Sequence, residues 1–220
     1  MKPLPKKKIG FIGLGTMGKP MAANIAKANF PLTVYDVRKE PVAEMEKLGA
    51  KVAKSARQVG KECDTVVVMV INYPQVKEVV FPPEGVLSEL SSGSTLIIAS
   101  TLSPSEVEEV EEMARGKGVG VIDSPVSGGQ ERAQDGSLTL MVGADRKVFA
   151  ENEEVLKAMG KYIYHMGKVG QGQTLKLVNQ MLVVANIVSV AEALTMAKKL
   201  GMDMQGLVDI ISKCTGDSWA

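Results

Sequence analysis

The stretch GFIGLGTMGKPMAANIA, residues 10–26, decides the fold of this chain. It carries the pattern G-x-G-x-x-G, directly after the apolar run KIGFI and at the start of a helical pattern. In such a stretch Gly13 allows a tight turn, Gly15 lets backbone approach a pyrophosphate, and Gly18 lets the helix pack close to the strand. The phosphates then lie at the helix N-terminus, where free N–H groups and the helix dipole favour negative charge. We therefore expect a dinucleotide-binding turn formed by Gly13, Leu14, Gly15, Thr16, Met17 and Gly18.

Apolar, β-branched runs recur along the chain, with helical patterns between most of them. After KIGFI (8–12) they are LTVYD (32–36), DTVVVMV (64–70), TLIIAS (95–100) and VGVID (119–123). Short apolar strands that alternate with helices indicate a parallel sheet covered on both faces. Two later runs, SLTLMVG (137–143) and YIYHM (162–166), are expected to add antiparallel strands to this sheet. The predicted fold class is α/β, a Rossmann-type doubly wound, mostly parallel sheet.

No strand pattern follows Gly170, and two helical patterns, separated near Gly201, run to the end. We expect a dinucleotide-binding domain over residues 1–168 and the start of an all-helical substrate or dimerisation domain over 169–220. The predicted helix between Leu175 and Leu200 has too much apolar surface for one exposed helix, which predicts a homodimer or homotetramer.

The balance of 26 Lys and Arg against 25 Asp and Glu gives no overall attraction to nucleic acid or to an anionic membrane. The basic residues Lys6 to Lys8 are interpreted as a solvated leader. The apolar run from Met181 to Leu194 is interrupted by Asn186 and Glu192 and is taken as too short to span a bilayer. We expect a protein without nucleic-acid or membrane partners.

With two cysteines and one histidine, the chain has few side chains that ligate metals or act as nucleophiles. No metal-ligand spacing is present, so no metal site is expected, and the two cysteines do not form a disulfide framework. The histidine, His165, is expected in a loop-like context. The N-terminus lacks a signal-peptide pattern, and a cytoplasmic location is expected.

Polar residues at the predicted strand ends are candidates for cofactor binding. Asp36 ends the second strand, where an acidic residue binds the adenosine ribose, and this favours NAD. The next residues, Arg38 and Lys39, could instead reach the 2′-phosphate of NADP, so NADP stays open. Asn72 and Thr101 follow two further strands, where open α/β sheets bind ligands, although such residues also cap helices. Ser103 with Glu106 is a capping box for a helix that begins near Pro104.

Two further motifs each allow a functional and a structural interpretation. In IDSPVSGGQERAQDGSL (122–138), Ser127, Gly128 and Gly129 could present N–H groups and a hydroxyl to a carboxylate, or form a flexible turn. In GQGQTLKLVNQ (170–180), Lys176 shares one face of a mostly apolar helix with Asn179 and Gln180. These polar residues either extend to solvent or line a pocket.

Four motifs together resemble the β-hydroxyacid dehydrogenase family: GFIGLGTMG, DSPVSGG (123–129), GSLTLMVG (136–143) and GQGQTLKLVNQ. The resemblance implies an NAD(P)-dependent oxidoreductase that acts on a small 3-hydroxy acid or the corresponding aldehyde acid. It implies that Ser127, Gly128 and Gly129 bind the substrate carboxylate and that Lys176 is the acid/base, on a helix that lines the cleft between two domains. It implies cofactor contacts for Asn72 and Thr101. Asn179 or Gln180 could hydrogen-bond the lysine or the substrate, and which of them takes the amide role stays open.

The chain departs from the family pattern at three places. Family members often have asparagine where this chain has Gln180, and smaller residues in the segment that holds Arg132, which could bias substrate choice. Relatives also continue beyond this chain's last residue, so a truncated or shortened second domain is expected. Two alternatives stay open: an NADPH-dependent reductase of short aldehydes such as glyoxylate or succinic semialdehyde, and a non-catalytic dinucleotide-binding or dimerisation fragment.

Overall fold

The computed structural model describes residues 6–218 and divides into two compact units after Lys176. The first unit contains the whole sheet, and the second begins at Leu177. The sequence places the domain boundary between residues 168 and 169, just before the last long helix begins. The structural division comes later because the first residues of that helix pack with the first unit.

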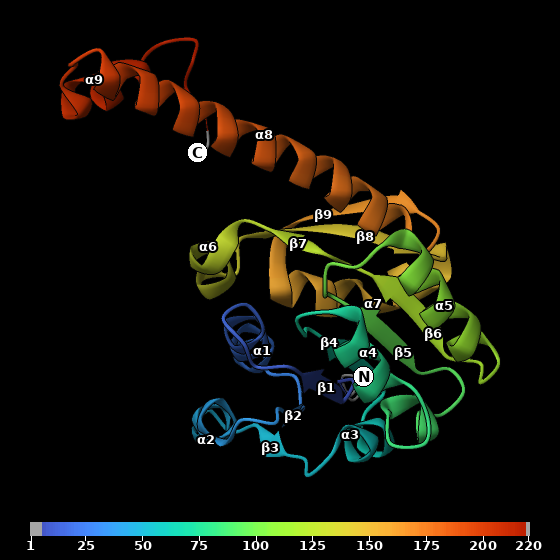
Figure 1. Ribbon diagram of the computed structural model, residues 1–220. Helices are drawn as coiled ribbons and strands as arrows, with labels where there is room; N and C mark the ends of the chain where they lie inside the picture. Colours follow the sequence, from blue (N-terminus) through green and yellow to red (C-terminus); the bar gives the residue numbers. More distant parts are fainter. Residues whose placement is uncertain (1–5, 219–220) are drawn as a thin grey trace, which may run out of the picture. The chain divides into compact units, whose positions relative to one another are not determined.

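Six parallel strands in the order β3-β2-β1-β4-β5-β6 form the centre of the first unit (Figure 1). This is the doubly wound arrangement of dinucleotide-binding domains, as predicted. The strands are β1 (Ile9–Ile12), β2 (Leu32–Tyr35), β3 (Lys51–Val52), β4 (Thr65–Val68), β5 (Thr95–Ile98) and β6 (Gly120–Asp123).

Three more strands extend the sheet beyond β6. β8 (Leu138–Ala144) pairs antiparallel with β6 and with β7 (Val126–Ser127), and β9 (Gly160–Gly167) pairs parallel with β8. Both predicted strands are present: β8 pairs antiparallel as expected, whereas β9 pairs parallel with β8 and is therefore antiparallel only to the six central strands. The sequence reading missed β3 and β7, because a two-residue strand is too short to show a pattern.

Helices cover both faces of the sheet, each over its own apolar core (Figure 1). One core includes residues of α1, α2 and α7, and the other includes residues of α3, α4 and α5. The helices are α1 (Gly18–Lys27), α2 (Lys39–Lys47), α3 (Ala56–Glu62), α4 (Tyr73–Val80), α5 (Pro104–Arg115), α6 (Gly129–Asp135) and α7 (Arg146–Met159), with a 3-10 turn, η1 (Val86–Ser88). Two buried faces explain why the central strands are apolar without alternation.

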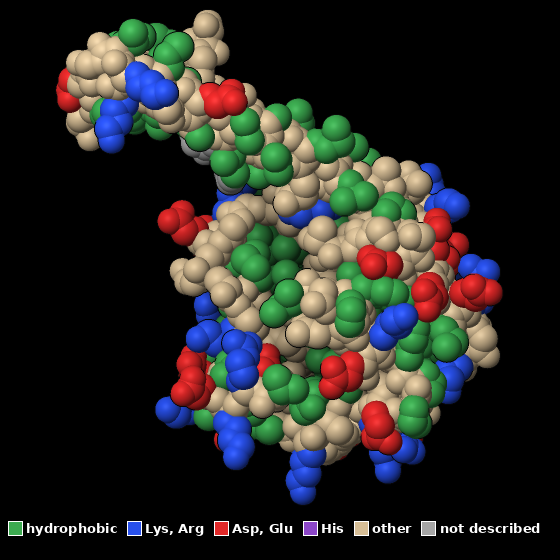
Figure 2. All heavy atoms as spheres, in the orientation of Figure 1, with side chains coloured by type: hydrophobic (Ala, Val, Ile, Leu, Met, Phe, Trp, Pro, Cys, Tyr) green, Lys and Arg blue, Asp and Glu red, His purple; other side chains and the backbone are tan. Residues whose placement is uncertain are grey.

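The second unit contains most of α8 (Gln171–Lys199) and all of α9 (Met204–Ile211). Gly201, with φ 74°, lies between them, as predicted. Apolar side chains are exposed along α8, among them Met181 and Leu182, and Figure 2 shows this apolar surface.

The expectation that this segment is too short to span a bilayer is wrong, because the helix has 29 residues, with mean hydropathy 1.6 over 18 of them. None of that 18-residue window is buried within the described residues, but one such helix is by itself weak evidence for a membrane.

The interpretation of Lys6 to Lys8 as a solvated leader is also wrong. The ammonium of Lys7 donates to Oδ1 of Asn152 at 3.0 Å, and the backbone N–H of Lys8 donates to Asp64 at 2.9 Å. The chain is therefore fixed to the first unit before β1 begins.

Asn152 generates a prediction about stability. It is fully buried; its Oδ1 accepts from the Thr65 hydroxyl, and its Nδ2 donates to the Thr95 hydroxyl, each at 3.0 Å. Asn152→Ala is expected to lower the free energy of unfolding by about 2–4 kcal/mol, because it leaves buried hydroxyls without partners. Chemical denaturation measures this loss, with Glu153→Ala on the same helix as the control. Dinucleotide affinity should not change, since both threonines begin their strands, at the sheet edge opposite the glycine turn. A loss no larger than that of the control would contradict the assignment.

Candidate active site

The glycine turn between β1 and α1 is built as the motif predicts. Gly13 has φ +92°, and a Cβ at this position would collide with the carbonyl of Met69. A Cβ at Gly18 would likewise collide with the carbonyl of Gly13. The N-cap residue of α1, Met17, contributes no side-chain hydrogen bond, in contrast to Asn72 and Ser103, which cap α4 and α5. The start of α1 is thus open to an anionic ligand.

A cavity of about 710 Å³ lies along this turn and the neighbouring strand ends. Its lining includes Gly13, Gly15, Thr16, Met17, Gly18, Asp36, Arg38, Ile71, Gln75 and Thr101. The glycine turn and the carboxyl ends of β2, β4 and β5 therefore line the same cavity. A glycine turn that excludes any side chain, an open helix start and an acidic residue at the end of β2 fit a dinucleotide.

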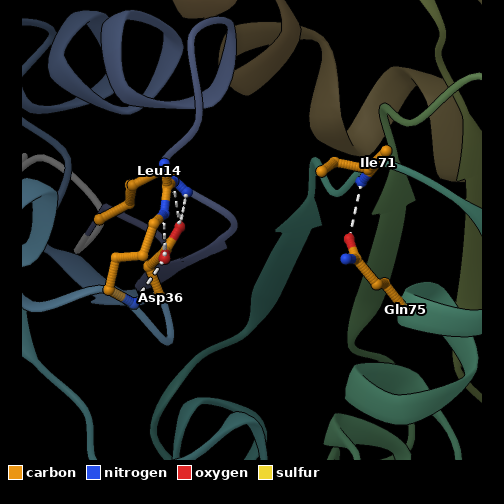
Figure 3. A network of polar contacts seen from close by, with 5 residues as sticks. Leu14, Asp36, Ile71 and Gln75 are labelled. Atoms are coloured by element: carbon orange, nitrogen blue, oxygen red, sulfur yellow. Dashed lines mark hydrogen bonds and ion pairs between the residues drawn. The ribbon is translucent and has the colours of Figure 1, made fainter.

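Asp36 lies at the end of β2 and accepts hydrogen bonds from both sides (Figure 3). The Leu14 N–H donates to Oδ2 at 2.6 Å, and Nε and Nη2 of Arg38 donate to Oδ1 and Oδ2 at 3.0 and 2.9 Å. Burial acts to raise the pKa of Asp36, but the hydrogen bonds from Arg38 and Leu14 outweigh it, and the pKa is lowered overall. The carboxylate is therefore ionised, and the Arg38 guanidinium is bound to it.

Of the other two predicted cofactor contacts, one lines the cavity and the other caps a helix. Thr101 is exposed and lines the cavity. Asn72 caps α4, because its side chain accepts from the N–H of Gln75 at 3.1 Å. The side chain of Gln75 in turn accepts from the Ile71 N–H at 3.0 Å, on the side of the cavity opposite Asp36 (Figure 3). The capping box of Ser103 and Glu106 is confirmed.

Lys176 is buried rather than extended to solvent, with 9% of its surface exposed. Its ammonium donates to the backbone carbonyl of Val126 at 2.8 Å, and burial lowers its pKa. Val126 directly precedes Ser127. The structure therefore brings the lysine and the Ser127 loop together, although 50 residues separate the bonded pair in sequence.

The Ser127 loop is ordered by secondary structure on both sides. Val126 and Ser127 form β7, and Gly129 begins α6. Gly128 has φ +129° and Gly129 has φ +70°, conformations that favour glycine. Two glycines in these conformations join β7 directly to α6. As in α1, the helix start carries no side-chain cap, so backbone N–H groups of the loop can bind an anion.

Two residues that the sequence reading left unassigned fix the start of α8. The Asp123 carboxylate, fully buried at the end of β6, accepts from the N–H groups of Gly170 and Gln173 at 2.9 and 2.8 Å. The Gln173 side chain donates to the Ser100 carbonyl at 2.9 Å and accepts from the Leu102 N–H at 3.0 Å. Asp123 lies in the motif DSPVSGG, and Gln173 lies in the motif GQGQTLKLVNQ. Their place in these motifs is the signal that could have identified them from the sequence.

Three further residues singled out in the sequence, Asn179, Gln180 and His165, lie outside the cavity at the glycine turn. Asn179 and Gln180 belong to the second unit, where their side chains meet at 3.4 Å, and their substrate roles stay predictions. His165 lies in β9 and not in a loop, 2.8 Å from the Ala144 carbonyl and stacked on Phe149. Its ring is thus engaged structurally. The described residues contain no group of three or more His, Cys, Asp or Glu that could hold a metal ion.

Comparisons with known proteins agree with this geometry. Residues 8–167 match the family model described as the NAD binding domain of 6-phosphogluconate dehydrogenase. Residues 170–220 match the one described as NAD-binding of NADP-dependent 3-hydroxyisobutyrate dehydrogenase.

Individual relatives are similar over almost the whole chain. 2-(Hydroxymethyl)glutarate dehydrogenase of Eubacterium barkeri is 39% identical over 97% of this chain and 71% of its own length. Mitochondrial 3-hydroxyisobutyrate dehydrogenase of Mus musculus is 36% identical over 98% of this chain, which spans only 64% of that enzyme. The solved structure of Mycobacterium tuberculosis 3-hydroxyisobutyrate dehydrogenase with L-serine has 33% identity and a TM-score of 0.88, over 97% of this chain and 72% of that one.

The buried carboxyl of Asp123 is expected to make the stability of the protein depend on pH. Burial raises its pKa from the ordinary 3.8 to about 6, although backbone N–H groups act in the opposite direction. The folded state therefore binds this proton more tightly than the unfolded state. The stability contribution of the group is fully present below pH 3.8 and is lost as pH rises through about 6.

Urea denaturation between pH 4 and pH 7 tests this dependence. Wild-type protein should lose up to about 3 kcal/mol of unfolding free energy relative to Asp123→Asn over this range. Asp145→Asn, at the exposed cap of α7, should keep the wild-type dependence. Parallel profiles for wild-type and Asp123→Asn would show that the carboxyl does not titrate in this window.

Proposed function

The chain belongs to the β-hydroxyacid dehydrogenase family, and from this membership we propose that its protein transfers a hydride between NAD or NADP and a small 3-hydroxy acid, or the corresponding aldehyde acid in the reverse direction. The activity is a proposal for the whole protein, because the chain spans 71% and 64% of the lengths of the two curated relatives named above. The cofactor, when bound, supplies the hydride acceptor or donor.

One observation carries the proposal: the Lys176 ammonium lies 2.8 Å from the Val126 carbonyl, directly before the Ser127 loop. Oxidation of an alcohol requires a group that takes up the hydroxyl proton, and reduction requires a group that returns it. A buried lysine with a lowered pKa releases its proton more readily than an exposed lysine, and the neutral amine takes the proton back in the reverse direction. While charged, it also stabilises negative charge on the substrate oxygen.

The Ser127 loop is suited to bind the carboxylate of such a substrate. Its hydroxyl and the backbone N–H groups of Gly128 and Gly129 can bind a carboxylate. The substrates in the names of the two relatives, 2-(hydroxymethyl)glutarate and 3-hydroxyisobutyrate, both carry a hydroxyl two carbons from a carboxylate carbon. A carboxylate on the loop then directs the neighbouring hydroxyl toward Lys176. The same geometry argues against the alternative of a non-catalytic dinucleotide-binding or dimerisation fragment, because a buried lysine beside the Ser127 loop has no role in such a fragment.

We also propose that the protein is a homodimer or homotetramer and that it is cytoplasmic. The exposed apolar side chains of α8 support the first. Gel filtration with light scattering of the natural full-length protein tests it, and a monomer at micromolar concentration would reject it.

The cofactor preference follows from Asp36. The ionised carboxylate of Asp36 repels the 2′-phosphate of NADP. It also binds the Arg38 guanidinium, which is then not available to bind that phosphate. NADH is therefore expected to bind more tightly than NADPH, and Asp36→Ala should narrow the difference. Fluorescence titration with both cofactors measures this, with Asp64→Ala as the control. If unaltered protein binds NADPH more tightly, cations such as Lys39 determine the preference instead.

Lys176→Ala tests the mechanism in the natural full-length protein. Turnover of 3-hydroxyisobutyrate should fall by a factor of about 10²–10⁴, the usual contribution of a positioned proton donor. NAD affinity should stay nearly constant, because the lysine does not line the cavity at the glycine turn. Lys168→Ala, an exposed lysine shortly before α8, is the control. A Lys176→Ala enzyme with normal turnover would exclude this lysine as the acid/base.

A further inference from the structure

A second polar pocket lies close to the Ser127 loop. It has a volume of about 490 Å³, and we call it the Arg132 pocket. Its lining residues are Arg132, Ser137, Thr139, Lys161, Tyr162 and Tyr164. Two cations, two phenols and two hydroxyls thus surround it, without a carboxylate among the described residues that line it. This composition suits an anion.

The strand register connects this pocket to the Ser127 loop. Ser127 on β7 is directly opposite Thr139 on β8, and Thr139 is opposite Tyr162 on β9. Residues that are directly opposite each other extend their side chains from the same face of a sheet. Neighbouring strands lie about 4.8 Å apart. The pocket therefore begins one strand away from Ser127, on the same face.

Arg132 is held against the loop itself. Its Cδ lies 2.6 Å from the position that a Cβ of residue 128 would take, so the arginine stem packs on the Gly128 backbone. Lys161 lies over the Tyr162 ring at 5.4 Å. Neither cation forms an ion pair within the described part of the chain. The pKa of Asp135 is lowered by hydrogen bonds from Ser137 and also by the charge of Arg132.

We propose that the Arg132 pocket binds a second carboxylate of the substrate, so that the enzyme prefers a hydroxy diacid of about five carbons to a monoacid. Carbon–carbon bonds of about 1.5 Å place the carboxylates of such a diacid roughly 5 Å apart, close to the spacing of one strand. With one carboxylate on the Ser127 loop, the other reaches the pocket, where the planar guanidinium of Arg132 can bind it through two hydrogen bonds. The inference rests on the proposed function, because it assigns the substrate class of the same site.

The test compares two substrates in the natural full-length protein with NAD. The diacid is 2-(hydroxymethyl)glutarate and the monoacid is 3-hydroxyisobutyrate. Arg132→Ala should lower kcat/KM for the diacid about 10-fold, mainly through KM, because it removes a charge-assisted hydrogen bond. The value for the monoacid should not change. Lys161→Ala should act in the same direction, and Arg115→Ala, an exposed arginine on α5, is the matched control.

The outcomes separate this inference from the proposed function. Equal effects of Arg132→Ala and Lys161→Ala on both acids, or no effect on either, would overturn the pocket assignment while the dehydrogenase function stands. If neither acid is oxidised, the proposed function fails, and calorimetric titration with glutarate and butyrate tests the pocket alone. Glutarate should then bind more tightly than butyrate, and Arg132→Ala should remove the difference. Glutarate binding that Arg132→Ala leaves unchanged would overturn the inference.

Discussion

The buried carboxylate of Asp123 fixes the start of α8, and the arrangement of the active site depends on this interaction. It accepts two backbone N–H groups from the chain that leads into the helix, at Gly170 and Gln173. Backbone N–H groups at a helix start otherwise need water or a side-chain cap, so an acidic residue from a distant strand is an effective anchor. Lys176 lies one turn further along the same helix. Asp123 thus fixes the first turn of the helix that carries Lys176.

The same anchor connects the substrate side of the site to the cofactor side. Gln173 bonds to the backbone at Ser100 and Leu102, which flank Thr101 in the cofactor cavity. The Ser100 hydroxyl accepts from the Val70 N–H at 2.9 Å, so the end of β4 joins the network. A parallel sheet makes this possible, because the carboxyl ends of its strands meet at one edge. The glycine turn, the start of α8 and the Ser127 loop thus all lie beside the ends of neighbouring strands.

Much of this architecture could be predicted because the decisive signals are local. The long apolar runs gave five of the parallel strands, and the glycine spacing gave the turn at Gly13 to Gly18. The role of Lys176 was undecided from the residues alone, since a lysine on an apolar helix can extend to solvent or line a pocket. Its bond to Val126, and the bonds of Gln173 across 71 to 73 residues, depend on the folded arrangement and have no spacing rule. The contacts of His165 could not be predicted for the same reason, because its partners lie on other elements.

The central claim is that one buried anchor places Lys176 beside a carboxylate-binding loop. A crystal structure of the natural full-length protein with NAD and a slowly reacting 3-hydroxy acid tests it most directly. The account predicts the acid's carboxylate on Ser127, Gly128 and Gly129, its hydroxyl within hydrogen-bond distance of the Lys176 ammonium, and Asp123 still bonded to Gly170 and Gln173. A bound acid whose hydroxyl lies away from Lys176, or whose carboxylate binds elsewhere, would contradict it.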